Sequence, residues 1–210
     1  MRGAIFDLDG TLFDSMWVWT RVDERFLERH RLPRDDDYLK SLGPMGFHRA
    51  AEYTKAYYQL PCTVEEIIDE WFLQAKDLYD HEVQLKDGAK EYLEKLRREG
   101  VRIGIATSNH RDLFVGTLER CGVADLFDAV ATTSEVSRNK DFPDVYLLAA
   151  ERLGTDPAET SVFEDIPQGL IGAKAGGFPT VGVEDDFSVK DRPEVMRLAD
   201  RYIKSFRELL

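Results

Sequence analysis

The sequence predicts an α/β fold: a Rossmann-like parallel sheet covered by helices on both faces, with an all-helical segment inserted after the first strand. Three observations predict it. Short apolar segments alternate with helical segments in the second half of the chain, which is typical of a parallel sheet. Several of those helices stop at a glycine, the residue that most readily takes the left-handed conformation after a helix. Between residues 16 and 81, aromatic residues recur at helical spacing without a strand-like run.

The first elements are a strand and the helical insert. Residues 2–6 form a short apolar run that ends in Asp7-Leu8-Asp9-Gly10-Thr11, as expected of a buried strand entering a loop. The insert is predicted to contain three or four helices, because breaks fall near Pro33, Gly43-Pro44 and Pro61.

The remaining elements alternate between helix and strand. The expected strands are 101–106, 161–163 and 180–183, and the expected helices end at Gly100, Gly122, Gly154 and Gly176. Residues 1–15 and 82–210 are therefore predicted to form an α/β core domain, and residues 16–81 a separate helical domain.

Composition narrows the classes of partner. The 210 residues include 28 Lys and Arg against 40 Asp and Glu, a formal charge of −12. Such a chain is expected to bind neither nucleic acid nor an anionic membrane, because both polyanions would be repelled. No apolar run approaches the roughly 18 residues of a membrane span, and two distant cysteines do not make a disulfide framework. We expect a cytoplasmic protein, as a monomer or alternatively a dimer.

Charged and hydroxyl side chains follow three of the predicted strands. Asp7 and Asp9 follow the first, Thr107 the second, and Glu164-Asp165 the third. Because parallel strands end at one edge of a sheet, these groups can converge there. Two carboxylates ~4 Å apart repel by roughly 4 kcal/mol at an effective dielectric constant of ~20, so the cluster must protonate or hold a cation. Oxygen ligands favour a hard cation such as Mg²⁺.

A phosphoryl-transfer site is the chemistry that this cluster predicts. Lys140 precedes the helix that starts near Pro143, and it adds a positive charge, while Thr107 adds a hydroxyl donor. Mg²⁺, a lysine and hydroxyl donors together suit a phosphorylated substrate.

The layout resembles the haloacid dehalogenase superfamily, and the resemblance extends over nearly the whole chain. Four segments carry it in the family's order: Asp7-Leu8-Asp9-Gly10-Thr11-Leu12-Phe13-Asp14-Ser15, Ile105-Ala106-Thr107-Ser108-Asn109, Lys140-Asp141-Phe142-Pro143-Asp144 and Val162-Phe163-Glu164-Asp165. Two positions depart from the family pattern. Ile166 stands where a serine is usual, and Asp141 replaces a proline. Asp141 either pairs with Lys140 or begins the following helix.

The resemblance implies catalytic roles residue by residue. Asp7 is expected to be the nucleophile that accepts the phosphoryl group. Asp9 is expected to protonate the leaving oxygen and then to deprotonate water. Thr107 would bind the phosphoryl oxygens, and Lys140 would neutralise them and orient Asp7.

The resemblance also implies ligand-binding residues. Mg²⁺ would be held by Asp7, the backbone carbonyl of Asp9 and Asp165, with Glu164 close by. Phosphate or substrate contacts are expected from the following residues: Thr107, Ser108, Asn109, Lys140 and Arg49.

The helical insert resembles the cap of the family's β-phosphoglucomutase-like branch, which would close over the site and select the substrate. A cationic residue there, such as Arg49, would help to draw a phosphorylated substrate into an acidic protein. The tryptophans of the insert, Trp17, Trp19 and Trp71, are interpreted as its core, with a substrate platform as the alternative.

The predicted function is a Mg²⁺-dependent phosphatase of a small phosphorylated metabolite, acting through an aspartyl phosphate. A phosphomutase is the alternative, disfavoured because residues 43–49 do not match the Gly-Val-Ser-Arg-type segment of β-phosphoglucomutases. A dehalogenase would leave Asp9, Glu164 and Asp165 without a task. A non-catalytic binding protein on the same scaffold would bind a ligand without turnover.

Overall fold

The chain folds into two compact units. The computed structural model describes residues 1–42, 45 and 47–210. One unit comprises residues 1–16 and 83–210, and the other comprises residues 17–82. We call them the core unit and the helical unit, and each is described by itself.

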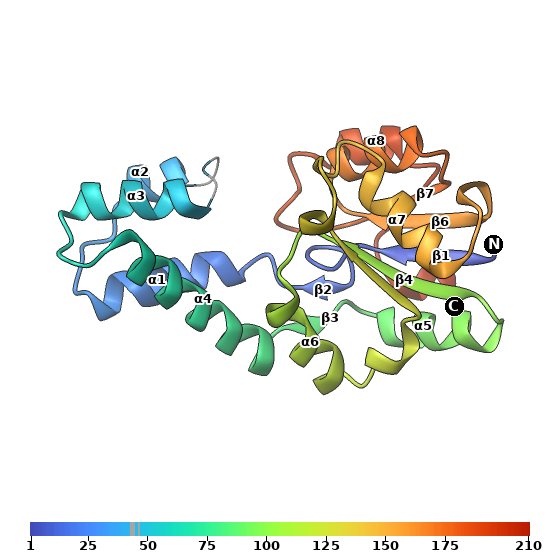
Figure 1. Cartoon of the computed structure of the whole chain (residues 1–210), viewed down its shortest axis with the longest axis horizontal. Coiled ribbons are helices and arrows are strands. Elements are labelled where there is room, and N and C mark those ends of the chain that lie inside the picture. Colours follow the sequence, from blue (N-terminus) through green and yellow to red (C-terminus); the bar gives the residue numbers. More distant parts are fainter. Residues whose placement is uncertain (43–44, 46) are drawn as a thin grey trace. The chain divides into compact units, whose positions relative to one another are not determined.

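A six-stranded parallel sheet forms the centre of the core unit (Figure 1). Its strand order is β5-β4-β1-β6-β7-β8, and all five pairings are parallel. The strands are β1 (Gly3–Phe6), β4 (Arg102–Thr107), β5 (Ala129–Thr132), β6 (Thr160–Glu164), β7 (Thr180–Val183) and β8 (Arg201–Ile203). Together with the flanking helices, the sheet confirms the predicted fold class.

The strand order predicts a ligand site beyond the carboxyl end of β1. From β1 the chain continues to β4 and β5 on one side, and it returns to add β6, β7 and β8 on the other side. The loops that follow β4 and β6 therefore lead away from β1 in opposite directions. In open α/β sheets, ligands bind beyond the carboxyl ends of the strands at such a switch point.

Helices cover both faces of this sheet (Figure 1). One face packs on α7 and α8 through a buried apolar cluster that includes Ile5, Val162 and Ala149. On the other face, Phe6 and Phe163 stack with ring centroids 4.4 Å apart, and Tyr92 of α5 and Phe206 join them. Successive residues of β1 and β6 thus contribute to opposite cores, which explains why β1 is buried throughout and why both Val162 and Phe163 of β6 are buried.

The helices of the core unit follow the predicted pattern, with additions. They are α5 (Ala89–Arg98), α6 (Arg111–Arg120), α7 (Asp144–Leu153), α8 (Pro167–Ala175) and α9 (Arg192–Leu198), with 3₁₀ turns at Ala124–Leu126, Thr133–Glu135, Pro157–Glu159 and Phe206–Leu209. Helix α7 is followed by Gly154 at φ 65°, the left-handed position that glycine occupies without strain. The sequence pattern did not predict α9, β5, β8 or the small antiparallel pair β2 (Phe13–Asp14) and β3 (Gln84–Leu85).

Four helices make up the described part of the helical unit, and that part contains no strand. They are α1 (Val18–Arg29), α2 (Asp36–Leu42), α3 (Phe47–Tyr58) and α4 (Val64–His81). The Thr63 hydroxyl accepts from the Glu66 N–H, and the Glu66 carboxylate accepts from the Thr63 N–H, so a capping box fixes the start of α4. The predicted break at Gly43-Pro44 lies outside the described residues.

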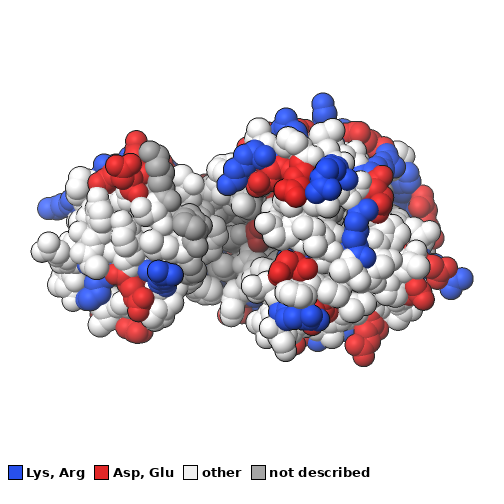
Figure 2. Space-filling model, turned by 90° about the horizontal axis from the view of Figure 1, so that it is seen from above, with Lys and Arg blue, Asp and Glu red and all other residues white. Residues whose placement is uncertain are grey.

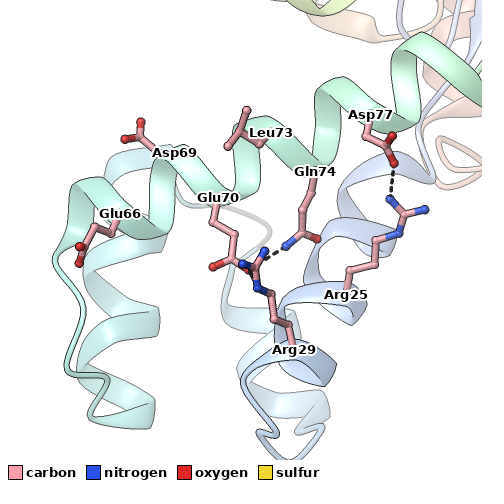
Figure 3. A pocket seen from close by; sticks show the side chains of 8 residues that line it. All are labelled: Arg25, Arg29, Glu66, Asp69, Glu70, Leu73, Gln74 and Asp77. Carbon is pink, nitrogen blue, oxygen red and sulfur yellow. Dashed lines mark hydrogen bonds and ion pairs between the residues drawn. The ribbon is translucent and has the colours of Figure 1, made fainter.

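Ion pairs and hydrogen bonds line the groove between α1 and α4 (Figure 3). Arg25 of α1 bonds Asp77 of α4 at 3.0 Å, and Arg29 lies 3.6 Å from Glu70, which also accepts from Gln74. Exposed pairs of this kind contribute little individually. No helix in the described ranges has both the length and the apolar character needed to span a bilayer.

Candidate active site

The ends of three adjacent strands bring the predicted residues together. Asp7 directly follows β1, Thr107 is the last residue of β4, and Glu164 is the last residue of β6. Phe6 is in register with Ile105 on β4 and with Phe163 on β6. The next residue of β1, Asp7, is therefore level with Glu164 at the carboxyl edge, as the parallel sheet predicts.

Lys140 joins two carboxylates in the interior of the core unit. Its Nζ donates to Asp7 Oδ1 and to Glu164 Oε1, both at 2.5 Å. Burial alone would lower the pKa of Lys140, but the charges of Asp7 and Glu164 outweigh burial and hold this pKa above its ordinary value. Lys140 therefore stays protonated at any physiological pH. Because α7 begins at Asp144 and Asp141 is exposed, neither role expected of Asp141 is borne out.

Tyr146 fixes the orientation of Glu164. Its hydroxyl donates to Glu164 Oε1 at 2.6 Å, so this oxygen accepts from both Tyr146 and Lys140. Oε2 of the fully buried Glu164 has no hydrogen-bond partner among the residues described. A Cβ at Gly169 would lie 2.3 Å from Glu164 Cδ, so only glycine leaves room for this carboxylate. Burial raises the pKa of Glu164 to about 7 despite the opposing effect of Lys140.

Two hydroxyls hold Asp165. Thr11 donates to Oδ1 at 3.0 Å, and Ser188 donates to Oδ2 at 3.5 Å. These hydroxyls from distant segments reach the carboxylate although Ile166 replaces the usual serine. The loop approaches so closely that a Cβ at Gly10, where φ is +78°, would lie 2.4 Å from Asp165 Oδ2. Burial, with Asp7 and Glu164 nearby, raises the pKa of Asp165 well above its ordinary value.

Asp7, Glu164 and Asp165 form an acidic cluster that can hold a metal ion. One carboxylate oxygen from each lies within 4.8 Å of the others, and all three side chains are buried. Lys140 balances only one of their negative charges when all three are ionised. The unpartnered Glu164 Oε2 and the all-oxygen donor set both suit a hard divalent cation such as Mg²⁺.

Asp9 lies apart from this cluster and has its own partners. Ser15 donates to Oδ1 at 2.6 Å, and the Asn109 side chain donates to Oδ2 at 2.8 Å. The carboxylate of Asp9 is not one of the three that converge, although its backbone carbonyl was expected to contact a metal. The two bonds fix its orientation in the loop after β1.

The last residue of β4 places a hydroxyl at the sheet edge. Thr107 is 1% exposed, and its Oγ1 accepts from the backbone N–H of Asn109 at 3.0 Å. Ser108 is exposed. The backbone after Thr107 therefore turns back on that hydroxyl, and Asn109 links this turn to Asp9.

Arg49 belongs to the helical unit, on an exposed position of α3. Its expected phosphate contact stays a prediction. On the face seen in Figure 2, acidic and basic side chains are interspersed, so the net negative charge is not gathered in one patch of that face.

Sequence reasoning gave no role to four residues that support the site: Thr11, Ser15, Tyr146 and Ser188. Thr11 and Ser15 belong to the first motif, so the motif itself was the available signal. Tyr146 lies in the first turn of α7, six residues after Lys140. Ser188 gave no signal, because only the tertiary fold brings it to Asp165.

Comparisons with known proteins agree with this geometry. The model of the haloacid dehalogenase-like hydrolase family matches residues 4–183. The chain is 33% identical to validoxylamine A 7'-phosphate phosphatase of Streptomyces hygroscopicus subsp. limoneus over 204 residues, 91% of this chain and 94% of the relative. It is 27% identical to hexitol phosphatase B of Escherichia coli K12, over 98% of this chain and 93% of the relative.

A solved structure shows the same fold. A Thermotoga maritima protein described as a β-phosphoglucomutase superposes with a TM-score of 0.87 at 24% identity, over 97% of this chain and 94% of that one. A likeness at this identity concerns the fold alone.

Proposed function

Because the chain belongs to the haloacid dehalogenase-like hydrolase family, we propose that it is a Mg²⁺-dependent phosphatase that cleaves a small phosphorylated metabolite through an aspartyl phosphate. The observation that carries the proposal is the buried Lys140 between Asp7 and Glu164. A lysine so placed neutralises the nucleophile and the incoming phosphate, which would otherwise repel each other.

The first step is transfer of the phosphoryl group to Asp7. The oxygen of Asp7 that does not accept from Lys140 attacks phosphorus, and the bond from phosphorus to the ester oxygen breaks. Asp9 donates a proton to the departing alkoxide, which leaves as an alcohol. The Thr107 hydroxyl donates to a phosphoryl oxygen, and Lys140 stays protonated throughout because its pKa is raised.

The second step is hydrolysis of the acyl phosphate. Asp9, now ionised, removes a proton from water, and the resulting oxygen attacks phosphorus. Inorganic phosphate leaves, and the Asp7 carboxylate is restored. Ser15 and Asn109 keep Asp9 oriented through both steps, because each oxygen of its carboxylate already accepts one hydrogen bond.

Asp7, Glu164 and Asp165 would hold the divalent cation. When bound, Mg²⁺ would offset the negative charge that the three carboxylates and the phosphate bring together. Thr11 and Ser188 hold Asp165, while Tyr146 and Lys140 hold Glu164. The protein thus supplies fixed oxygen ligands.

The helical unit serves as a cap in this proposal. It would select the non-phosphate part of the substrate and exclude water during phosphoryl transfer. The relatives that are named for phosphorylated carbohydrate-like substrates support a small phosphomonoester. A mutase finds support in the fold alone.

Release of inorganic phosphate tests the proposal. Purified protein with Mg²⁺ is given p-nitrophenyl phosphate and a panel of phosphorylated metabolites, with and without EDTA. We expect EDTA to stop release and Asp7→Asn to reduce kcat by about 10⁴-fold or more. Asp125→Asn, at an exposed position of the same unit, is the matched control and should turn over normally. Undiminished turnover by Asp7→Asn with EDTA present would refute the proposal.

A further inference from the structure

Lys86 occupies a half-buried position in the core unit, and the proposed mechanism gives it no role. It directly follows β3, and its side chain is 15% exposed. Its Nζ donates to the backbone oxygen of Glu184 at 2.6 Å and lies 2.9 Å from Asp185 Oδ2. The side chain of Asp185 is 3% exposed, so the ion pair is largely buried. Desolvation offsets much of the attraction in such a pair, so added stability alone does not explain it.

The backbone of Lys86 holds the loop that follows β1. Its N–H donates to the Leu12 carbonyl at 2.8 Å, one residue beyond the pairing of β2 with β3. Leu12 comes directly after Thr11, whose hydroxyl donates to Asp165 Oδ1 at 3.0 Å. Lys86 therefore fixes the segment that presents the first hydroxyl to the proposed metal ligand Asp165.

The side chain of Lys86 holds the loop that follows β7. While Oδ2 of Asp185 faces Lys86, Oδ1 accepts from the Phe187 N–H at 2.9 Å. The backbone oxygen of Asp185 accepts from the Ser188 N–H at 3.2 Å, and the two bonds close a turn. This turn presents the second hydroxyl, because Ser188 Oγ contacts Asp165 Oδ2 at 3.5 Å.

The residues on either side of Ser188 are not packed into the core. Phe187 and Val189 are 53% and 49% exposed. The contact from Ser188 to Asp165 is at the outer limit of hydrogen-bond length, so a slight outward shift of the turn would break it. The position of the Ser188 hydroxyl therefore depends on the bonds that Asp185 makes.

We propose that Lys86 is a positioning residue for the Mg²⁺ site, because it holds the two loops whose hydroxyls orient Asp165. Its N–H holds Leu12 in one loop, and its ammonium group holds Glu184 and Asp185 in the other. A carboxylate that is already oriented binds a metal ion more tightly, because less conformational freedom is lost on binding. This role rests on the proposed function, since it concerns a ligand of the same site.

A purely structural tie is the alternative, and Lys95 is an example of one. Its Nζ donates to the backbone oxygens of Leu209 and Leu210 at 2.8 and 2.9 Å, which attaches α5 to that segment. Lys95 is half-buried, as Lys86 is. Neither of the two loops that hold Asp165 takes part in this contact, so Lys95 provides a matched control.

Mg²⁺ binding tests the proposal independently of turnover. The Mg²⁺ midpoint, which is the concentration at half-maximal thermal stabilisation of the full chain, is measured for the wild type, Lys86→Met and Lys95→Met. We expect Lys86→Met to raise the midpoint by about tenfold, as is typical when the support of a metal ligand is removed. Lys95→Met should leave the midpoint unchanged, whatever its effect on Tm.

Kinetics separate positioning from direct participation in the reaction. With p-nitrophenyl phosphate at limiting Mg²⁺, Lys86→Met should be about tenfold slower than the wild type. At saturating Mg²⁺, kcat should return to within about threefold of the wild-type value, because the bound ion itself orients Asp165. A loss of kcat that saturating Mg²⁺ does not restore would overturn the positioning role.

A milder variant keeps the test decisive if Lys86→Met folds poorly. Asp185→Asn retains an oxygen for the Phe187 N–H but removes the charge that pairs with Lys86. We expect it to raise the Mg²⁺ midpoint by about threefold. In a Ser188→Ala background the same substitution should add little, because its effect acts through that hydroxyl. If the effects of the two substitutions multiplied, the proposed path from Lys86 to Asp165 would be wrong.

The outcomes separate this inference from the proposed function. If Mg²⁺ stabilised the wild type and the midpoint were unchanged in both Lys86→Met and Asp185→Asn, the inference would be overturned and the phosphatase would stand. If Mg²⁺ did not stabilise the wild type and no substrate released phosphate, both would be overturned.

Discussion

Acids with raised pKa values in the two units have different surroundings. In the core unit, Glu164 accepts from Lys140 and Tyr146, and Asp165 accepts from Thr11 and Ser188. In the helical unit, Asp23 is only half-buried, and burial together with the nearby Glu24 raises the pKa of its carboxyl to about 7. The core unit thus holds its acids in fixed positions by hydrogen bonds, whereas the surroundings of Asp23 in the helical unit favour its protonated form.

The fixed acids of the core unit suit the chemical step of the proposed reaction. Phosphoryl transfer needs charges that do not reorganise during the reaction, and hydrogen-bonded carboxylates around a lysine provide them. The fixed acids and the half-buried Asp23 should therefore respond differently to substitution and to pH.

Removing the lysine should have the largest effect. Lys140→Met leaves Asp7 and Glu164 buried without their cation, so we expect unfolding free energy to fall by about 3–5 kcal/mol. Activity should fall by about 10³-fold, because the incoming phosphate loses its positive partner. Denaturant titration and phosphate release measure both effects.

A surface lysine provides the comparison. Lys174 bonds Asp200 at 2.6 Å, and both side chains are well exposed. Lys174→Met should therefore cost under about 1 kcal/mol and leave turnover unchanged. If the two variants lost equal stability, the core unit would not hold its acids through Lys140.

Crowding Glu164 should have the next largest effect. Gly169→Ala adds a Cβ 2.3 Å from Glu164 Cδ, which forces the carboxylate or α8 to move. We expect a loss of about 1–3 kcal/mol together with weaker binding of Mg²⁺. The Mg²⁺ concentration at half-maximal thermal stabilisation gives the second readout, and Ile171→Ala, exposed on the same helix, should leave it unaltered.

Tyr146→Phe removes one hydrogen bond from Glu164 without changing the ring. The expected cost is about 1–2 kcal/mol, with kcat reduced by about tenfold and the Mg²⁺ midpoint raised. Tyr92→Phe is the matched control, since Tyr92 is also buried but packs with Phe163 on the opposite face of the sheet. If Tyr146→Phe lost stability without any change in the Mg²⁺ midpoint, Tyr146 would contribute to packing alone and would not orient Glu164 for the metal.

The smallest expected effect is the pH dependence of stability that arises from Asp23 in the helical unit. The pKa of Asp23 is raised to about 7 from 3.8, so its folded form binds more protons between these values. Its contribution to stability is therefore present at low pH and is lost as pH rises toward 7. Asp23→Asn should remove this dependence.

Melting curves at pH 5 and pH 8 measure the difference. We expect the Tm of the wild type, relative to that of Asp23→Asn, to fall by about 2–4 °C between them. If the Tm difference between the wild type and Asp23→Asn were the same at both pH values, Asp23 would be ionised and solvated at both. The contrast between the acids of the two units would then be lost.

The sequence predicted the parts of the molecule that depend on local pattern. The buried strands β1 and β6 contain short apolar runs that predict a strand. Asp7, Lys140 and Glu164 lie in motifs that occur in this chain in the family's order. The edge strand β8 escaped prediction because it has three residues, of which only Ile203 is buried. A strand that short does not establish an alternation.

Contacts that depend on tertiary packing could not be predicted. Tyr146 reaches Glu164 because α7 presents that face to the sheet, and a sequence does not fix the rotation of a helix so closely. Ser188 and Asp165 are 23 positions apart, and only the arrangement of β6 and β7 brings them together. Likewise, nothing in the sequence around Asp23 indicates that the fold raises the pKa of its carboxyl.

The central claim is that Asp7 carries the phosphoryl group during turnover. The most direct test is to quench the protein with acid while it turns over p-nitrophenyl phosphate with Mg²⁺, reduce acyl phosphates with borohydride, and map the peptides by mass spectrometry. Reduction of an aspartyl phosphate gives homoserine, so the account predicts homoserine at position 7. Modification at another carboxylate, or none at all during full turnover, would contradict it.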